Sequence, residues 1–207
     1  MSAPTALLLH GQWMGGWTFG WLGHVLRGAG LGTRAVDYPS TEDSPEALVE
    51  RLARAVAETP GDVHLVGHSM GGVVVLRYLQ TGADARVRRA LLLGTPALGC
   101  RAALEFEQQP LGRFMLGRST AFWRAPFPDR VDTPVEVGAI AGDSPFGLGA
   151  VLIRLPEPSD GVVTVAETRI GGLHDHIVLP VSHTGMLLSG DVGRQAVAFL
   201  GRGRFEK

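Results

Sequence analysis

The sequence of 207 residues lacks several features that mark specialised classes of protein. It contains one cysteine, Cys100, so the chain can form no disulfide of its own and no metal site of the CxxC type. No stretch approaches the roughly 18 apolar residues that a membrane-spanning helix needs. Lysine and arginine form no run, and the formal net charge is −1. Nothing in the composition therefore favours nucleic acid or an anionic membrane as a partner.

Targeting and cofactor motifs are also missing. Residues 1–10 contain no lysine or arginine, and their apolar run of three leucines is too short for a secretory signal, so we expect a cytoplasmic protein. The sequence has no Walker loop and no G-x-G-x-x-G after a strand, and we expect no cofactor. His174 and His176 would share one face of an extended segment, but no third ligand is evident, so we expect a solvated turn rather than a metal site.

What the sequence does contain is typical of a globular protein. Hydrophobic residues make up 45% of the chain and charged residues 19%, and the length fits one domain over residues 1–207. Six short apolar runs predict buried strands: 6–10, 34–38, 63–67, 90–94, 135–141 and 176–180. Because their hydrophobicity is continuous rather than alternating, these strands are expected to be covered on both faces.

Helical patterns fall between the predicted strands. They span residues 16–28, 44–58, 70–80 and 192–200. Strands that alternate with helices predict a mostly parallel sheet with helices on both faces, an α/β fold. Residues 101–133 interrupt the alternation, and we interpret them as a small cap or an irregular wall over the sheet.

Residues 67–71 read Gly-His-Ser-Met-Gly, which is the G-x-S-x-G pattern of a nucleophile elbow. A predicted strand precedes the pattern and a predicted helix follows it directly, as the motif requires. The sharp turn leaves room only for small residues two positions from the serine, and both positions are glycine. We therefore predict Ser69 as a nucleophile. The alternative interpretation is a packing junction between a strand and a helix.

A serine nucleophile needs a base that is oriented by an acid. Around this elbow the chain order is serine, acid and then histidine. Four of the seven histidines precede Ser69, and His174 and His176 lie at the wrong end of the last predicted strand. His183 follows that strand, where a site at the C-terminal edge of a parallel sheet would lie. His183 is therefore the predicted base.

Two aspartates are candidates for the acid. Asp160 lies in Ser-Asp-Gly-Val-Val, 23 residues before His183. Asp143 directly follows the predicted strand 135–141, in a Gly-Asp-Ser-Pro sequence that also suits an ordinary turn. Order along the chain permits both, so the residues themselves leave this choice open.

An acyl-transfer site also needs two backbone N–H groups that bind the developing oxyanion. The residue after the nucleophile, Met70, is expected to supply one of them. Residues 10–13, His-Gly-Gln-Trp, follow the first predicted strand, and Gly11 lets the backbone come close to a substrate. Gln12 is the candidate for the second donor. Without the other motifs, this segment would be read as a simple turn.

Together these motifs resemble the α/β-hydrolase superfamily, and particularly its small lipases and esterases with a minimal fold. The blocks that carry the resemblance are Leu-His-Gly at 9–11, Val-Gly-His-Ser-Met-Gly-Gly at 66–72, Leu-Gly-Thr-Pro at 93–96, Ser-Asp-Gly-Val-Val at 159–163 and Val-Ser-His-Thr at 181–184. They follow the family's order over nearly the whole chain. Because the first strand begins near residue 6, the two strands that usually precede it have no room, and a minimal six-stranded sheet is implied.

The resemblance also implies roles for the candidate residues. It implies Ser69 as nucleophile, His183 as base and Asp160, in preference to Asp143, as the acid. It implies further that Gln12 and Met70 bind the oxyanion.

The function that this resemblance implies first is hydrolysis of a carboxylic ester, with a small acyl ester as substrate. The same triad fits an acyltransferase or a thioesterase, and a non-catalytic binding protein on a hydrolase fold is the third hypothesis. Six aromatic residues are candidates to line an acyl pocket: Trp13, Phe106, Phe114, Phe122, Trp123 and Phe127. Burial as ordinary core under the cap is the competing interpretation of the aromatic residues after position 100.

Overall fold

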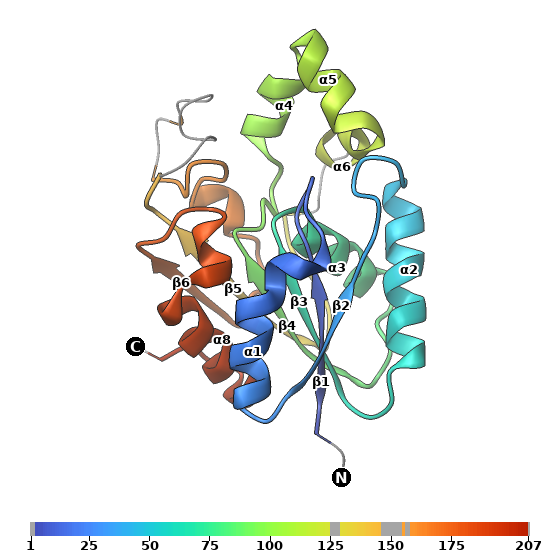
Figure 1. Ribbon diagram of the computed structural model, residues 1–207, viewed down its shortest axis with the longest axis vertical. Helices are drawn as coiled ribbons and strands as arrows, with labels where there is room; N and C mark the ends of the chain where they lie inside the picture. Colours follow the sequence, from blue (N-terminus) through green and yellow to red (C-terminus); the bar gives the residue numbers. More distant parts are fainter. Residues whose placement is uncertain (1–2, 125–128, 146–154, 156–157, 207) are drawn as a thin grey trace.

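Six parallel strands form a single sheet at the centre of the molecule (Figure 1). A computed structural model describes residues 3–124, 129–145, 155 and 158–206. The strands are β1 (Thr5–Leu9), β2 (Gly32–Val36), β3 (Val63–His68), β4 (Val87–Leu93), β5 (Glu136–Gly142) and β6 (Asp175–Leu179). Their order is β2-β1-β3-β4-β5-β6, and all five pairings are parallel. The predicted six-stranded α/β-hydrolase sheet is confirmed.

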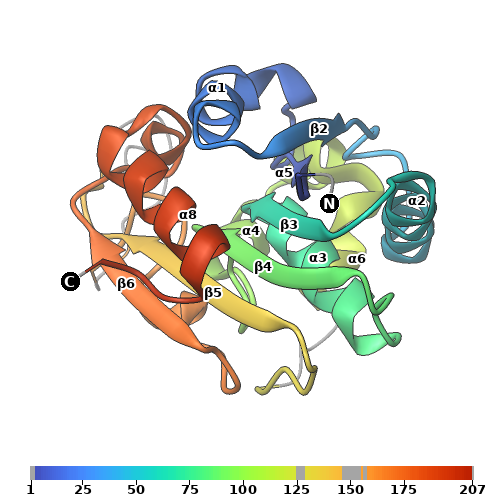
Figure 2. The ribbon, with the colours of Figure 1, turned by 90° about the horizontal axis from the view of Figure 1, so that it is seen from below.

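Helices cover both faces of this sheet (Figure 2). One face carries α1 (Gly20–Gly28), which follows the 3-10 turn η1 (Gly16–Phe19), together with α8 (Gly190–Arg202). The other face carries α2 (Pro45–Glu58) and α3 (Met70–Gln80). Two further 3-10 turns, η3 (Ala166–Thr168) and η4 (Gly185–Leu188), flank β6 in the chain.

The continuous apolar runs follow from this layering. In β1, Leu7 and Leu9 pack into the core beneath α2 and α3, whereas Ala6 and Leu8 pack toward α1 and α8. Side chains alternate across a strand, so a strand between two helical layers needs apolar residues at every position. Each leucine buried in this way contributes about 1.5–3 kcal/mol.

Local signals were sufficient for two helix starts but not for the bounds of one strand. Ser44 caps α2 by accepting from the Ala47 N–H at 3.3 Å, and Ser189 caps α8 in the same way. The strand predicted at 34–38 begins and ends two residues earlier, because β2 pairs residue by residue with β1. Tyr38 lies beyond the strand, is buried, and donates its hydroxyl hydrogen to the His10 carbonyl.

Short helical segments form a cap beyond the C-terminal ends of the strands (Figure 1). They are α4 (Arg101–Glu107), α5 (Pro110–Leu116), the 3-10 turn η2 (Gly117–Ser119) and α6 (Thr120–Arg124). The predicted interruption at 101–133 therefore contains regular structure over most of its length. No helix among the described residues is long and apolar enough to cross a membrane.

Candidate active site

Ser69 lies at the tight turn between β3 and α3. Its backbone has φ 54° and ψ −122°, a region that residues with a side chain rarely adopt. A Cβ on Gly67 would collide with Gly72, and one on Gly71 would collide with the carbonyl oxygens of Leu9 and His10. Small residues are therefore required on both sides of the serine, as the motif predicted.

His183 and Asp160 form a buried pair. The His183 Nδ1 and the Asp160 Oδ2 lie 2.7 Å apart, and the Asp160 side chain is 1% exposed. The backbone also joins the two residues, since the His183 N–H donates to the Asp160 carbonyl at 2.9 Å. With Nδ1 directed at the carboxylate, Nε2 is the ring nitrogen left to exchange a proton with a nucleophile.

Both oxygens of the Asp160 carboxylate make hydrogen bonds within the protein. Its Oδ1 accepts from the N–H groups of Val162 and Val163 at 2.9 and 2.8 Å, while Oδ2 faces His183. Asp143, the other candidate, is exposed and its backbone N–H donates to Leu179. Within the described part of the chain, the Asp143 carboxylate makes no hydrogen bond, so only Asp160 has the contacts of an orienting acid.

His68 supports the His183 segment from inside the protein. Its Nε2 lies 2.9 Å from the His183 carbonyl, and the two rings stack obliquely with centroids 4.7 Å apart. Burial lowers the pKa of His68 to about 3, with the nearby His183 as a second cause. A neutral His68 can donate from Nε2 to that carbonyl, which fixes the backbone of the predicted base.

A cavity of about 400 Å³ opens above Ser69 and beneath the cap. Ser69, His183 and Gln12 all line it, so the structure brings these three predicted residues to one space. Most of its other lining residues are apolar and come from the cap and the loops around it: Cys100, Ala102, Ala103, Phe106, Met115, Leu116 and Trp123, with Trp13, Met14 and Val162. Gly11, His68, Gly161 and Thr184 complete the lining.

The two predicted oxyanion donors lie on adjacent backbone segments. A Cβ on Gly11 would come within 3.2 Å of the Ser69 Cβ, so the loop passes close to the predicted nucleophile. Among the described residues, the backbone N–H groups of Gln12 and Met70 have no protein acceptor. Unpaired N–H groups beside a nucleophile are what an oxyanion hole requires.

Only some of the six aromatic residues predicted to line the pocket do so. Trp13, Phe106 and Trp123 line the cavity. Phe122 is instead buried in the core beneath the cap, where the Arg77 guanidinium lies 5.3 Å from its ring centroid. Phe114 is 83% exposed on α5 and does not line the cavity. Phe127 lies outside the described residues.

Several wall residues carried no signal in the sequence. Cys100, Ala102, Met115 and Leu116 are small or apolar residues that belong to no motif, and only the folding of the cap brings them over Ser69. The histidines at the start of β6 make separate contacts. His176 shares a hydrogen bond with the Thr168 hydroxyl at 2.9 Å, whereas His174 is exposed.

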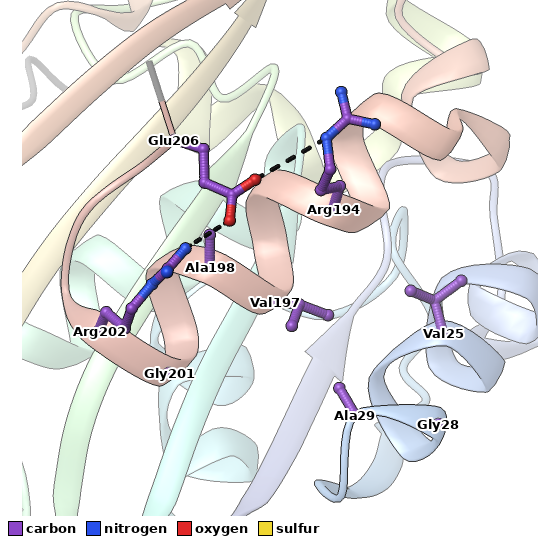
Figure 3. A pocket seen from close by; sticks show the side chains of 9 residues that line it. All are labelled: Val25, Gly28, Ala29, Arg194, Val197, Ala198, Gly201, Arg202 and Glu206. Carbon is purple, nitrogen blue, oxygen red and sulfur yellow. Dashed lines mark hydrogen bonds and ion pairs between the residues drawn. The ribbon is translucent and has the colours of Figure 1, made fainter.

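A second, larger hollow lies between α1 and α8, away from the cap (Figure 3). Its volume is about 590 Å³, and its floor is formed by small apolar residues such as Val25, Ala29 and Val197. Arg194 and Arg202 both pair with Glu206 at its rim. None of the described serines or histidines lines this hollow, so its size does not make it the candidate active site.

Comparison with solved structures identifies similar folds. The mature form of lipase BlEst2 from Bacillus licheniformis superposes with a TM-score of 0.78 over 97% of this chain and 91% of that chain, at 18% identity. A lipase-esterase related protein from Clostridium acetobutylicum gives 0.63 over 96% and 93%, at 14% identity. The pyrethroid hydrolase PytH gives 0.70 over 97% and 98%, at 15% identity.

These identities are low, so the likeness establishes the fold and not the substrate. No curated protein matches the chain in sequence. A family model described as the alpha/beta hydrolase family matches residues 6–197, which is nearly the whole chain. The chain therefore belongs to the alpha/beta hydrolase family.

Proposed function

We propose that this protein hydrolyses carboxylic esters through a triad of Ser69, His183 and Asp160. The observation that carries the proposal is the buried contact of 2.7 Å between His183 and Asp160, at a cavity that the strained elbow serine also lines. The three residues come from separate loops at the C-terminal edge of the sheet. A purely structural turn would not need a strained serine, a buried pair of histidine and aspartate, and the chain order of serine, acid and histidine together.

In the first half of the reaction, His183 Nε2 takes the hydroxyl proton of Ser69 as Oγ attacks the ester carbonyl carbon. The carbonyl oxygen becomes an oxyanion and accepts from the N–H groups of Gln12 and Met70. His183 then gives its proton to the leaving alcohol as the carbon–oxygen bond breaks, which leaves an acyl group on Ser69.

In the second half, water replaces the alcohol. His183 takes one water proton while the hydroxyl attacks the acyl carbon, and the proton then returns to Ser69 as the acid is released. Asp160 remains ionised throughout, since its role is to hold the imidazole and to stabilise its protonated form. No cofactor is needed for either half.

The apolar walls of the cavity suit the acyl part of the substrate. Phe106, Leu116 and Trp123 present hydrocarbon surface to the space above Ser69, and no lysine, arginine or acidic side chain of the described residues lines it. A chain of methylene groups placed there gains about 0.8 kcal/mol for each one that leaves water. The names of the similar lipases are consistent with an ester substrate.

The test is hydrolysis of p-nitrophenyl esters from C2 to C16 by the wild type and Ser69→Ala. We expect wild-type turnover and a loss of about 10⁴-fold or more in the variant, since a triad without its nucleophile retains little activity. The chain-length optimum then reports how much of the cavity the acyl group fills. Absence of serine-dependent turnover on every ester, in a folded sample, would contradict the proposal and direct attention to thioesters or acyl transfer.

A further inference from the structure

The loop that carries Gln12 is fastened to the cap by a side-chain hydrogen bond. The Gln12 Nε2 donates to the Ser119 Oγ at 2.7 Å, across 107 residues of sequence. The Ser119 hydroxyl in turn donates to the Leu116 carbonyl at 2.6 Å. Ser119 is 0% exposed, so water does not compete for this contact. The Ser119 hydroxyl therefore both accepts and donates, and its orientation is fixed.

The next residue of the loop has contacts to the same cap. The Trp13 indole N–H donates to the Met115 carbonyl at 3.0 Å, and the indole meets the Phe106 ring edge to face with centroids 6.1 Å apart. On its other side, the Trp13 backbone N–H donates to the Ser40 Oγ at 2.9 Å. The loop is thus held between the cap and the segment that follows β2.

This loop needs such support because its backbone is strained. Trp13 has φ 59°, and it shares a positive φ with only one other non-glycine residue of the described chain, Ser69. A bulky residue in this conformation costs of order 1–3 kcal/mol and persists only where its surroundings hold it there. If the loop relaxed, the peptide planes on either side of Gln12 would rotate, and the Gln12 N–H would turn away from the reacting oxygen.

We propose that Ser119 of the cap is a positioning residue for the oxyanion hole, acting through the side chain of Gln12. The inference rests on the ester hydrolysis proposed above and adds a role for the cap. The cap forms one wall of the cavity and also sets the direction of the N–H group that binds the oxyanion. A substrate that displaces the cap would therefore lower the rate of its own turnover as well as its binding.

The experiment compares Ser119→Ala and Gln12→Met with the wild type on one short soluble ester. We expect kcat to fall about tenfold in each, which is less than the roughly 10²- to 10³-fold loss from removing an oxyanion donor outright. KM should change by less than about twofold, because a neutral ester makes little use of the oxyanion hole before the transition state. Gln12→Met keeps the backbone N–H and leaves the Ser119 contact with Leu116 intact, so it separates positioning from the stability of the cap.

The affinity for a trifluoromethyl ketone with a short alkyl chain distinguishes a positioning role from a purely structural one. It forms an anionic adduct with Ser69, and its affinity should fall by the same factor as kcat in both variants. The double variant should be no worse than the poorer single variant, since both changes remove one contact. Thr120→Val is the matched control, because the Thr120 hydroxyl contacts only the Gly117 carbonyl among the described residues.

Two outcomes would overturn the inference. One is an unchanged kcat and ketone affinity in Ser119→Ala and Gln12→Met, with the wild type active. The other is additive losses in the double variant, which would show that the two side chains act separately. An inactive wild type would instead contradict the ester hydrolase proposal itself, so the two failures can be told apart.

Discussion

The sheet around the elbow and the cap above it are built differently, although both line the same cavity. Every residue of β3 is buried, and so is every residue of α3 except Arg77 and the last one, Gln80. The cap leaves large apolar side chains in solvent instead, among them Leu104, Leu111 and Phe114. Its helices are short, with seven residues in α4 and α5 and five in α6.

The contrast separates two tasks. The proposed triad of Ser69, His183 and Asp160 requires fixed geometry, and its residues lie on loops anchored to the buried sheet. The cap supplies most of the apolar wall, where shape rather than orientation decides binding, and segments with few buried contacts open most easily. The hydrogen bonds from Gln12 to Ser119 and from Trp13 to Met115 are two of the contacts that join these parts.

Replacing Asp160 with asparagine should disable the site at the sheet edge while the cap stays intact. We expect kcat to fall about 10³- to 10⁴-fold, because an amide can present a donor to Nδ1 and leave His183 in the wrong tautomer. The unfolding temperature should change little, since the amide oxygen would still accept from the backbone N–H groups. Asp143→Asn is the control and should retain full turnover. Equal losses in both variants would contradict the choice of acid.

Acid should destabilise the sheet through His64, whose pKa is lowered to about 4 by burial and by the charge of Arg89. The unfolded chain binds this proton below about pH 6.5 and the folded chain only near pH 4. The contribution of neutral His64 to the free energy of unfolding is therefore complete above pH 6.5. Between pH 6.5 and about pH 4 this contribution falls by about 1.4 kcal/mol for each pH unit. Denaturant titrations at pH 7 and pH 5 measure the loss.

His64→Leu should flatten this pH dependence, and His24→Gln, at an exposed position of α1, should leave it unchanged. Residues 101–124 contain no histidine, so the loss of stability that comes from histidine protonation concerns the sheet and not the cap. If the unfolding free energy of His64→Leu still falls with pH as in the wild type, another buried group causes the effect, and His68 is the next candidate.

Two glycine substitutions should act separately, one on the sheet and the other on the cap. A Cβ on Gly138 would collide with the Phe199 ring between β5 and α8, and one on Gly112 would collide with the Phe106 carbonyl inside the cap. Gly138→Ala should lower the free energy of unfolding by about 1–3 kcal/mol through overpacking. Gly112→Ala should instead raise the rate of amide hydrogen exchange, and only in the cap. Equal exchange changes throughout the molecule would mean that cap and sheet unfold as one unit.

The smallest effect is expected at the outer surface of the cap. Phe114→Ser should change kcat and KM for a short soluble ester by less than about twofold, because an exposed side chain away from the cavity contributes little. Trp123→Ser, which removes a lining ring, is the comparison and should raise KM for longer acyl chains. A large loss in Phe114→Ser would show that α5 turns inward when substrate binds.

Local sequence signals were sufficient for the sheet. The runs of apolar residues located all six strands, and the helix over 70–80 has the predicted bounds. The sequence also located the glycines and the serine of the elbow, because a turn this tight restricts which residues can occupy it. The two-residue error in β2 arose because pairing with β1, and not local hydrophobicity, determines where that strand begins.

The pocket could not be predicted in the same way. An exposed phenylalanine at 114, a buried one at 122 and a lining tryptophan at 123 look alike as apolar residues of one segment. Which face of a short helix points inward depends on how the helix packs, and α5 and α6 are too short for a periodic pattern to show it. The roles of Ser69, His183, Asp160, Gln12 and Met70 remain predictions.

The layered sheet, the elbow and the chain order of serine, aspartate and histidine could be read from the amino-acid sequence, because each depends on neighbours within a few residues or on a simple alternation. The tertiary structure alone decided that Asp160 and not Asp143 contacts His183, and that Ser119 reaches Gln12 across 107 residues. These contacts join residues far apart in the chain, and their distances follow only once the sheet, its loops and the cap have packed together.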